Sequence, residues 1–156
     1  MLQEVGRMEI RLARAQDRPA ILALTDRFAE FELPSWRTRD EVNAGTRRQV
    51  ERALAHVSDR SQVLVATEAG RVVGFAWMLV IEDFYRGIDM AKLSEIAVAE
   101  DGLGIGSALI AAAEEWARER GLGMLVLNVM NGNLRARRLY ERAGFAAEYS
   151  MMAKVL

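Results

Sequence analysis

Residues 96–110 have the sequence IAVAEDGLGIGSALI. Apolar residues run up to Ala99, glycines follow at positions 102, 104 and 106, and apolar residues then recur at helical spacing. This order predicts a strand, a glycine loop and a helix. Glycines have no Cβ atom, so a ligand can approach the backbone closely, and the free N–H groups of a helix start suit a pyrophosphate. Taken alone, the pattern fits a plain turn slightly better than a phosphate site.

Two other nucleotide-binding motifs are excluded, one by the glycine spacing and the other by the absence of a lysine. A dinucleotide fingerprint, G-x-G-x-x-G, would need a glycine where the sequence has Ser107 or Leu109. A Walker loop needs Gly-Lys followed by Ser or Thr, and no lysine occurs between Lys92 and Lys154.

The segments on both sides of the glycine loop predict further strands and helices, which together form a mixed α/β fold. The strand expected over 72–81 is apolar on both faces, so we expect it to be covered on both sides. The element order is β-α-α-β-β-β-α-β-α-β, which indicates a mixed sheet with helices on its faces. The other expected elements are strands over 9–13, 62–67, 92–99, 124–129 and 146–155, and helices over 17–31, 39–57, 105–121 and 133–144.

Composition narrows the class of protein. The chain has 156 residues, which suits a single domain over 1–156, and 51% of them are hydrophobic. Its net charge of −1 shows no basic excess, so we expect no nucleic-acid partner. The chain has no cysteine, and its single histidine, His56, cannot build a multi-histidine metal site. It has neither the apolar run of a signal peptide nor a membrane-spanning stretch, so we expect no membrane partner and a cytoplasmic location.

A second stretch, NGNLRARRLYERAGF at 131–145, makes the interpretation of the glycine loop more specific. The two stretches resemble the two signatures of the GNAT (GCN5-related N-acetyltransferase) family, and the resemblance is closest from Lys92 to Phe145. It implies an α/β (α+β) fold with a mixed, mostly antiparallel sheet of six to seven strands, a splayed parallel pair and helices on both faces. It also implies acetyl-CoA as cosubstrate, with no metal. The residues implied to bind it are Ile96, Ala97, Val98, Gly102, Leu103, Gly104, Ile105, Gly106, Ser107, Asn133 and Tyr140.

The chain departs from the family pattern at Asp101. Three residues before the glycine aligned as Gly104 the family usually has Arg or Gln, and Leu103 is also uncharged. Backbone N–H groups make the main pyrophosphate contacts in this family, so binding should survive. An acidic side chain here could weaken binding of an anionic cofactor, or point into solvent, or cap N–H groups of the loop.

The resemblance assigns Tyr140 as the general acid for the departing thiolate, and a main-chain N–H near Val98 as the donor to the oxyanion. A phenol with a pKa near 10 stays protonated at neutral pH and can donate. Helical periodicity alone would make Tyr140 a packing residue.

The base that deprotonates the amine is a separate question, and Glu95 is the favoured candidate by a small margin. Alternatively, Glu95 is a carboxylate on the sheet edge or in an ion pair with Lys92 or an arginine. Glu82 and Asp83 could line the same cleft or belong to a solvated loop, and a chain of water molecules could also deprotonate the amine.

The acceptor side is expected in two loops, FELPSWRT and EDFYRGID. Their mixture of aromatic and acidic groups favours a cationic amine such as a polyamine, an aminoglycoside or a lysine side chain, although polar loops are common. The expected partner is a small-molecule amine or a protein or peptide amine, and a homodimer is also expected. The alternative function is an inactive CoA-binding sensor or partner domain. The residues proposed for the acceptor are Phe31, Trp36, Glu82, Asp83, Phe84 and Tyr85.

Overall fold

The computed structural model describes residues 8–156. The N-terminal segment in which we expected no signal peptide begins with residues 1–7, which lie outside the described residues. In chain order, the elements are β1 (Glu9–Leu12), η1 (Ala15–Asp17), α1 (Arg18–Leu24), η2 (Thr25–Arg27), α2 (Arg39–Ala55), β2 (Ser61–Glu68), β3 (Arg71–Glu82), β4 (Asp89–Val98), α3 (Ile105–Glu119), β5 (Leu125–Val126) and α4 (Leu134–Arg142).

The strands form one sheet in the order β1-β2-β3-β4-β5. The first three pairings are antiparallel, and β4 pairs with β5 in parallel through only Ala91↔Leu125 and Lys92↔Val126. Beyond Lys92 the two strands separate, as the resemblance implied for the splayed pair. β4 also carries a bulge, because Met78 pairs with Leu93 while the adjacent Trp77 pairs with Glu95.

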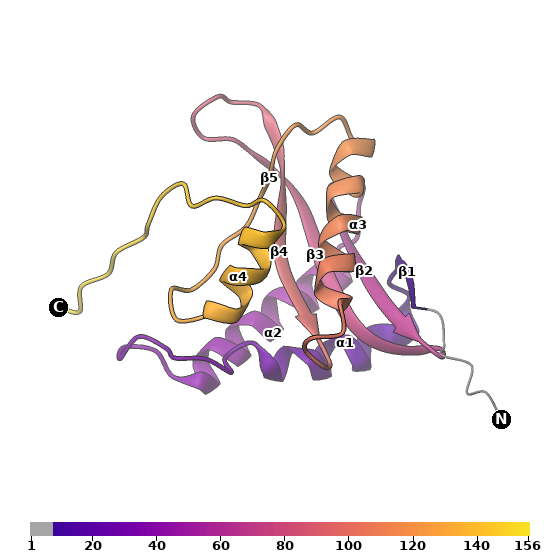
Figure 1. Ribbon diagram of the computed structural model, residues 1–156, viewed down its shortest axis with the longest axis horizontal. Coiled ribbons are helices and arrows are strands. Elements are labelled where there is room, and N and C mark those ends of the chain that lie inside the picture. The colour runs from indigo at the N-terminus through magenta and orange to yellow at the C-terminus, as the bar shows by residue number, and fades with distance from the viewer. Residues whose placement is uncertain (1–7) are drawn as a thin grey trace.

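Each face of the sheet has its own apolar core. Phe75 and Trp77 of β3 pack with α1 and α2, whereas Ala76 and Met78 pack with α3 and Tyr140. Figure 1 shows the same arrangement, with α3 and α4 on one side of the sheet and α1 and α2 on the other. The expected two-sided covering of this strand is therefore confirmed.

Gly74 lets α3 approach β3 closely. A Cβ atom at this position would lie 3.0 Å from Cγ2 of Ile105, 3.1 Å from the Ala97 carbonyl oxygen and 3.1 Å from Cδ1 of Leu109. Ile105 is the first residue of α3, so the missing side chain of Gly74 fixes where the glycine loop enters the helix.

Two expectations about the C-terminal third are wrong. The strand expected over 124–129 pairs only at Leu125 and Val126, and no strand forms over 146–155, so the described sheet has five strands. The segment after Phe145 leaves the sheet (Figure 1), and Tyr149, Met151 and Met152 are exposed. A strand needs a neighbouring edge for its hydrogen bonds, and two paired residues of β5 offer too short an edge.

The helix expected over 17–31 is shorter than expected, because α1 ends at Leu24 and only the 3-10 turn η2 continues it to Arg27. The remaining expected elements form within a few residues of their expected bounds. The main difference is that the turn between β3 and β4 is shorter than expected, because both strands extend toward it. In the part of the chain from 8 onward, no helix is both long enough and apolar enough to cross a membrane.

Gly74→Val should lower the free energy of unfolding by about 1–3 kcal/mol, because the branched side chain would push α3 off the sheet. Gly45→Ala is the control, since Cβ there meets only Nη2 of Arg48 at 3.7 Å and alanine favours a helix interior. Thermal melting of both variants checks this. A Gly74→Val protein that melts like the parent would contradict this packing.

Candidate functional site

The edge of β4 that faces β5 is open beyond Lys92. The Ala99 N–H donates to the Val73 carbonyl at 2.8 Å, so Ala99 directs its backbone groups toward β3. In an antiparallel pair this direction alternates along the strand. Ala97 therefore also bonds toward β3, whereas Ile96 and Val98 direct their N–H groups toward the open side. Extended backbone with free N–H groups can bind a ligand with amide groups as an additional strand would.

The glycine loop continues from this strand into α3. Gly102 and Gly104 have φ angles of 81° and 76°, and no heavy atom lies within 4 Å of a Cβ built on either residue. Gly104 is the N-cap of α3, and no side chain caps the first N–H groups of this helix. The first turn of α3 contains no acidic residue. Exposed N–H groups at the positive end of a helix fit a pyrophosphate.

The α4 helix brings Tyr140 beside this region. Asn133 caps α4 as expected, because its Oδ1 accepts from the Ala136 N–H at 3.2 Å. Gly106 lets the two helices meet, since a Cβ there would lie 3.0 Å from Cδ2 of Leu139. Tyr140 is buried and packs edge-on against Phe145, with 5.9 Å between ring centroids.

Tyr140 and Glu95 influence each other electrostatically. Burial raises the pKa of Glu95 to about 7, and the nearby Lys92 only partly opposes this. Burial, and then the negative charge of Glu95, raise the pKa of Tyr140 to about 12. At neutral pH the phenol is therefore protonated, and the carboxyl group lies near the midpoint of its titration. This is the combination that a general acid and a general base require.

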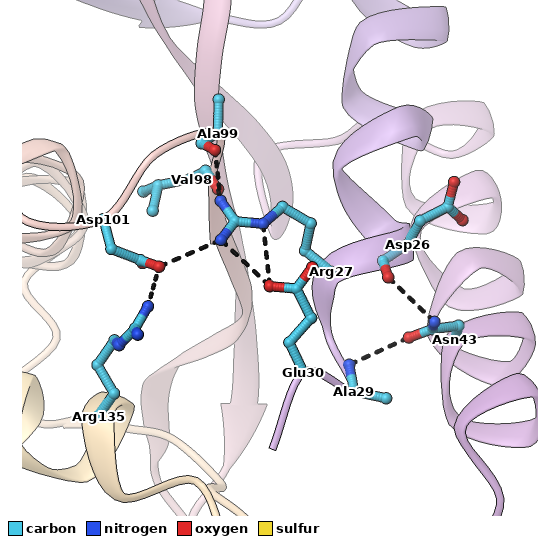
Figure 2. A network of polar contacts seen from close by, with 9 residues as sticks. All are labelled: Asp26, Arg27, Ala29, Glu30, Asn43, Val98, Ala99, Asp101 and Arg135. Atoms are coloured by element: carbon cyan, nitrogen blue, oxygen red, sulfur yellow. Dashed lines mark hydrogen bonds and ion pairs between the residues drawn. The ribbon is translucent and has the colours of Figure 1, made fainter.

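Asp101 is held between two arginines from other elements (Figure 2). One of its carboxylate oxygens accepts from Arg27 of η2 at 3.1 Å and from Arg135 of α4. Arg27 also donates to the Val98 carbonyl at 2.6 Å and contacts Glu30 at 3.2 Å. The acidic departure at position 101 is therefore neutralised by neighbouring cations.

Neither Arg27 nor Arg135 was among the residues expected at the site. Arg27 lies 71 residues from Val98, so no local pattern could connect them. For Arg135 one signal was available, since a cation in the first turn of a helix opposes the helix dipole and calls for a partner.

The structure does not gather the proposed acceptor residues into one cluster. Phe31 and Trp36 lie between α1 and α2, whereas the residues from Glu82 to Tyr85 lie at the turn between β3 and β4. These two segments are at opposite ends of the molecule in Figure 1.

Within the turn between β3 and β4, Asp83 is buried and serves the turn itself. It accepts from Arg86 Nε at 2.7 Å and from the Tyr85 N–H at 2.9 Å. These two bonds lower its pKa, with Arg86 the larger cause. Phe84 and Tyr85 are exposed beside it.

The loop between α1 and α2 reaches the start of α4. A Cβ atom at Gly132 would overlap the carbonyl oxygen of Glu32, so only glycine permits this contact. The loop that contains Phe31 and Trp36 therefore lies against the start of α4, the helix that carries Tyr140.

A hollow of about 410 Å³ lies elsewhere, at the far edge of the sheet beside β1, and is lined by Arg11, Thr67 and their neighbours. It is separated from β4 by β2 and β3, so it is not part of this site. Across residues 8–156, no group of three or more His, Asp or Glu side chains could hold a metal ion.

Comparison with known proteins shows the family and the fold. The family model described as the acetyltransferase (GNAT) family matches residues 23–145. An uncharacterized N-acetyltransferase of Bacillus subtilis, YhfO, is 27% identical over 88% of this chain and 89% of its own length. A mycothiol acetyltransferase of Thermobispora bispora is 36% identical over 83% of this chain, but the match spans only 43% of that protein.

Among solved structures, the ribosomal-protein-alanine N-acetyltransferase of Brucella melitensis is similar to this chain. It superposes with a TM-score of 0.71 at 25% identity, over 96% of this chain and 100% of the other.

Glu95→Gln should stabilise the protein increasingly as pH rises. The folded-state pKa of about 7 exceeds the ordinary value of 4.5, so ionisation of Glu95 disfavours the fold. The parent therefore loses stability as pH rises from 4.5 through 7, and the glutamine variant does not undergo this loss. The difference in melting temperature should grow by a few degrees between about pH 5 and about pH 8.

Glu119→Gln, an exposed change on α3, is the control and should show the same difference at both pH values. A Glu95→Gln difference that is independent of pH would show that the carboxyl group of Glu95 is well solvated.

Proposed function

The chain belongs to the GNAT family of acetyltransferases, and we propose that it transfers an acetyl group from acetyl-CoA to a primary amine. The observation that carries this proposal is the pairing of a carboxyl group with a pKa near 7 and a phenol with a pKa near 12, beside the open edge of β4. An acid and a base with separated pKa values are what amide formation from a thioester requires.

The binding side of the proposal rests on backbone groups. The N–H groups from Gly102 to Ser107 bind the pyrophosphate, and the open edge of β4 at Ile96 and Val98 binds the amide-containing arm. Acetyl-CoA supplies an activated acyl group as a thioester. The exposed glycines and the uncapped start of α3 support this placement.

In the proposed reaction, Glu95 accepts a proton from the amine, and the amine nitrogen attacks the thioester carbonyl carbon. The Val98 N–H donates to the oxygen of the resulting tetrahedral intermediate. As the carbon–sulfur bond breaks, Tyr140 donates its phenolic proton to the sulfur. The acetylated nitrogen then releases its second proton, which restores the phenol of Tyr140. The products are the N-acetylated amine and CoA with a free thiol, and the proton on Glu95 passes to solvent.

The proposed role of Tyr140 requires that its hydroxyl be accessible although the ring packs in the core. No buried side-chain nitrogen or oxygen in residues 8–156 lacks a hydrogen-bond partner, and the Tyr140 hydroxyl makes no bond to the described residues. The hydroxyl oxygen is therefore accessible to solvent, although the ring is buried.

For the acceptor we propose a cationic primary amine, either a small molecule or a peptide. The exposed acidic groups near the first loop, Glu30 and Glu32, together with Trp36, support a cationic ligand. The name of the mycothiol acetyltransferase relative also favours a small-molecule amine, although the match covers less than half of that protein.

Gly104→Val should abolish CoA binding, because its side chain would occupy the space through which the pyrophosphate approaches. Gly87→Val is a matched control. Both glycines have positive φ angles, 76° and 64°, and open space at Cβ, so both substitutions strain the backbone similarly. Calorimetry with CoA should detect the loss only for Gly104→Val. Equal CoA affinity in the two variants would place the cofactor elsewhere.

Tyr140→Phe should lower turnover by roughly 10²–10⁴-fold, because it removes only the proton donor and keeps the packed ring. Acetyl-CoA affinity should change little, since the hydroxyl acts as charge develops on sulfur. Steady-state rates on amines found in a screen, together with binding and melting data, check this. Unchanged turnover would make Tyr140 a packing residue. A parent protein that binds CoA but acetylates no amine would favour the sensor alternative.

A further inference from the structure

Arg135 occupies a position that the stability of its own helix does not explain. It is the second residue of α4, and a cation in the first turn opposes the helix dipole. Its side chain is 74% exposed, and the contact it makes with the described residues is the ion pair with Asp101. Figure 2 shows it reaching from α4 to the start of the glycine loop.

Arg27, the other arginine on Asp101, has a different setting. Its side chain is only 29% exposed, and it is held by the Val98 carbonyl at 2.6 Å and by Glu30 at 3.2 Å. Arg27 therefore anchors the end of β4 and stays in place. Arg135 is free to exchange its partner, because an exposed ion pair is weak.

The glycine loop creates a need for such a cation. Its own charged residues, Glu100 and Asp101, are both acidic, and they directly precede the exposed backbone at Gly102 and Gly104. Asp101 is neutralised by Arg27 and Arg135, but a phosphate approaching that backbone still meets the carboxylate of Glu100. A guanidinium that is already beside the loop can bind two phosphate oxygens at once and offset that repulsion.

We propose that Arg135 binds the pyrophosphate of the cosubstrate, and that Asp101 holds its guanidinium beside the glycine loop until the pyrophosphate replaces the carboxylate. The inference rests on the proposed function, because it takes acetyl-CoA as the ligand. Arg135 of α4 would then supply the positive charge that the family pattern often places at the position of Asp101.

The test is calorimetry with CoA and with dephospho-CoA, which keeps the pyrophosphate but lacks the 3′-phosphate. The variants are Arg135→Gln, Asp101→Asn and the double variant, with melting curves for each. The matched control is Arg142→Gln, which removes the same charge from the other end of α4, about 10 Å along the helix.

Arg135→Gln should weaken binding of both ligands roughly tenfold at low salt and less at high salt, whereas Arg142→Gln should change neither. Asp101→Asn should tighten binding of both ligands, and the double variant should bind like Arg135→Gln alone, because Asp101 acts through Arg135.

Three results would overturn the inference. Arg135→Gln could behave like Arg142→Gln, or it could weaken only CoA, which would assign Arg135 to the 3′-phosphate. Asp101→Asn could also tighten binding as much in the Arg135→Gln background as in the parent, which would mean that Asp101 repels the ligand directly. Failure of the parent protein to bind either ligand would instead refute the proposed function, and this inference with it.

Discussion

Between Leu93 and Val98, β4 has a strand on one side only. Its pairing with β5 ends at Lys92, while its pairing with β3 continues to Val98. Backbone groups in such a half-buried position need partners. Arg27 supplies one for the Val98 carbonyl, and the N–H groups directed to the open side stay available to a ligand. Divergence of the parallel pair is therefore the constraint from which the proposed binding edge follows.

Close helix packing places the rest of the site around this edge. Without a side chain at Gly74, α3 sits directly on β3, and this fixes the glycine loop at the end of β4. Without one at Gly106, α4 packs against α3 and carries Tyr140 toward Glu95. The glycines thus act in two ways, since Gly102 and Gly104 expose backbone whereas Gly74 and Gly106 bring elements together.

Features encoded by neighbouring residues could be predicted from the sequence. These include the two-faced β3, the glycine loop, the Asn133 cap and the position of Tyr140 on α4. Features that depend on distant residues could not. The contact between Arg27 and Val98 spans 71 residues, and the strand expected over 146–155 does not form because the sheet offers it no sufficient edge. The bulge between Leu93 and Glu95 likewise arises from pairing with β3.

Coupling between Glu95 and Tyr140 has a direction that suits the proposed reaction. While Glu95 is ionised, its charge raises the pKa of Tyr140, so the phenol keeps its proton as the amine approaches. Once Glu95 has taken the proton of the amine it becomes neutral, and this contribution to the pKa of Tyr140 disappears. The phenol then donates more readily, at the stage when negative charge develops on sulfur. In the proposed reaction, deprotonation of the nucleophile would thus prepare protonation of the leaving group.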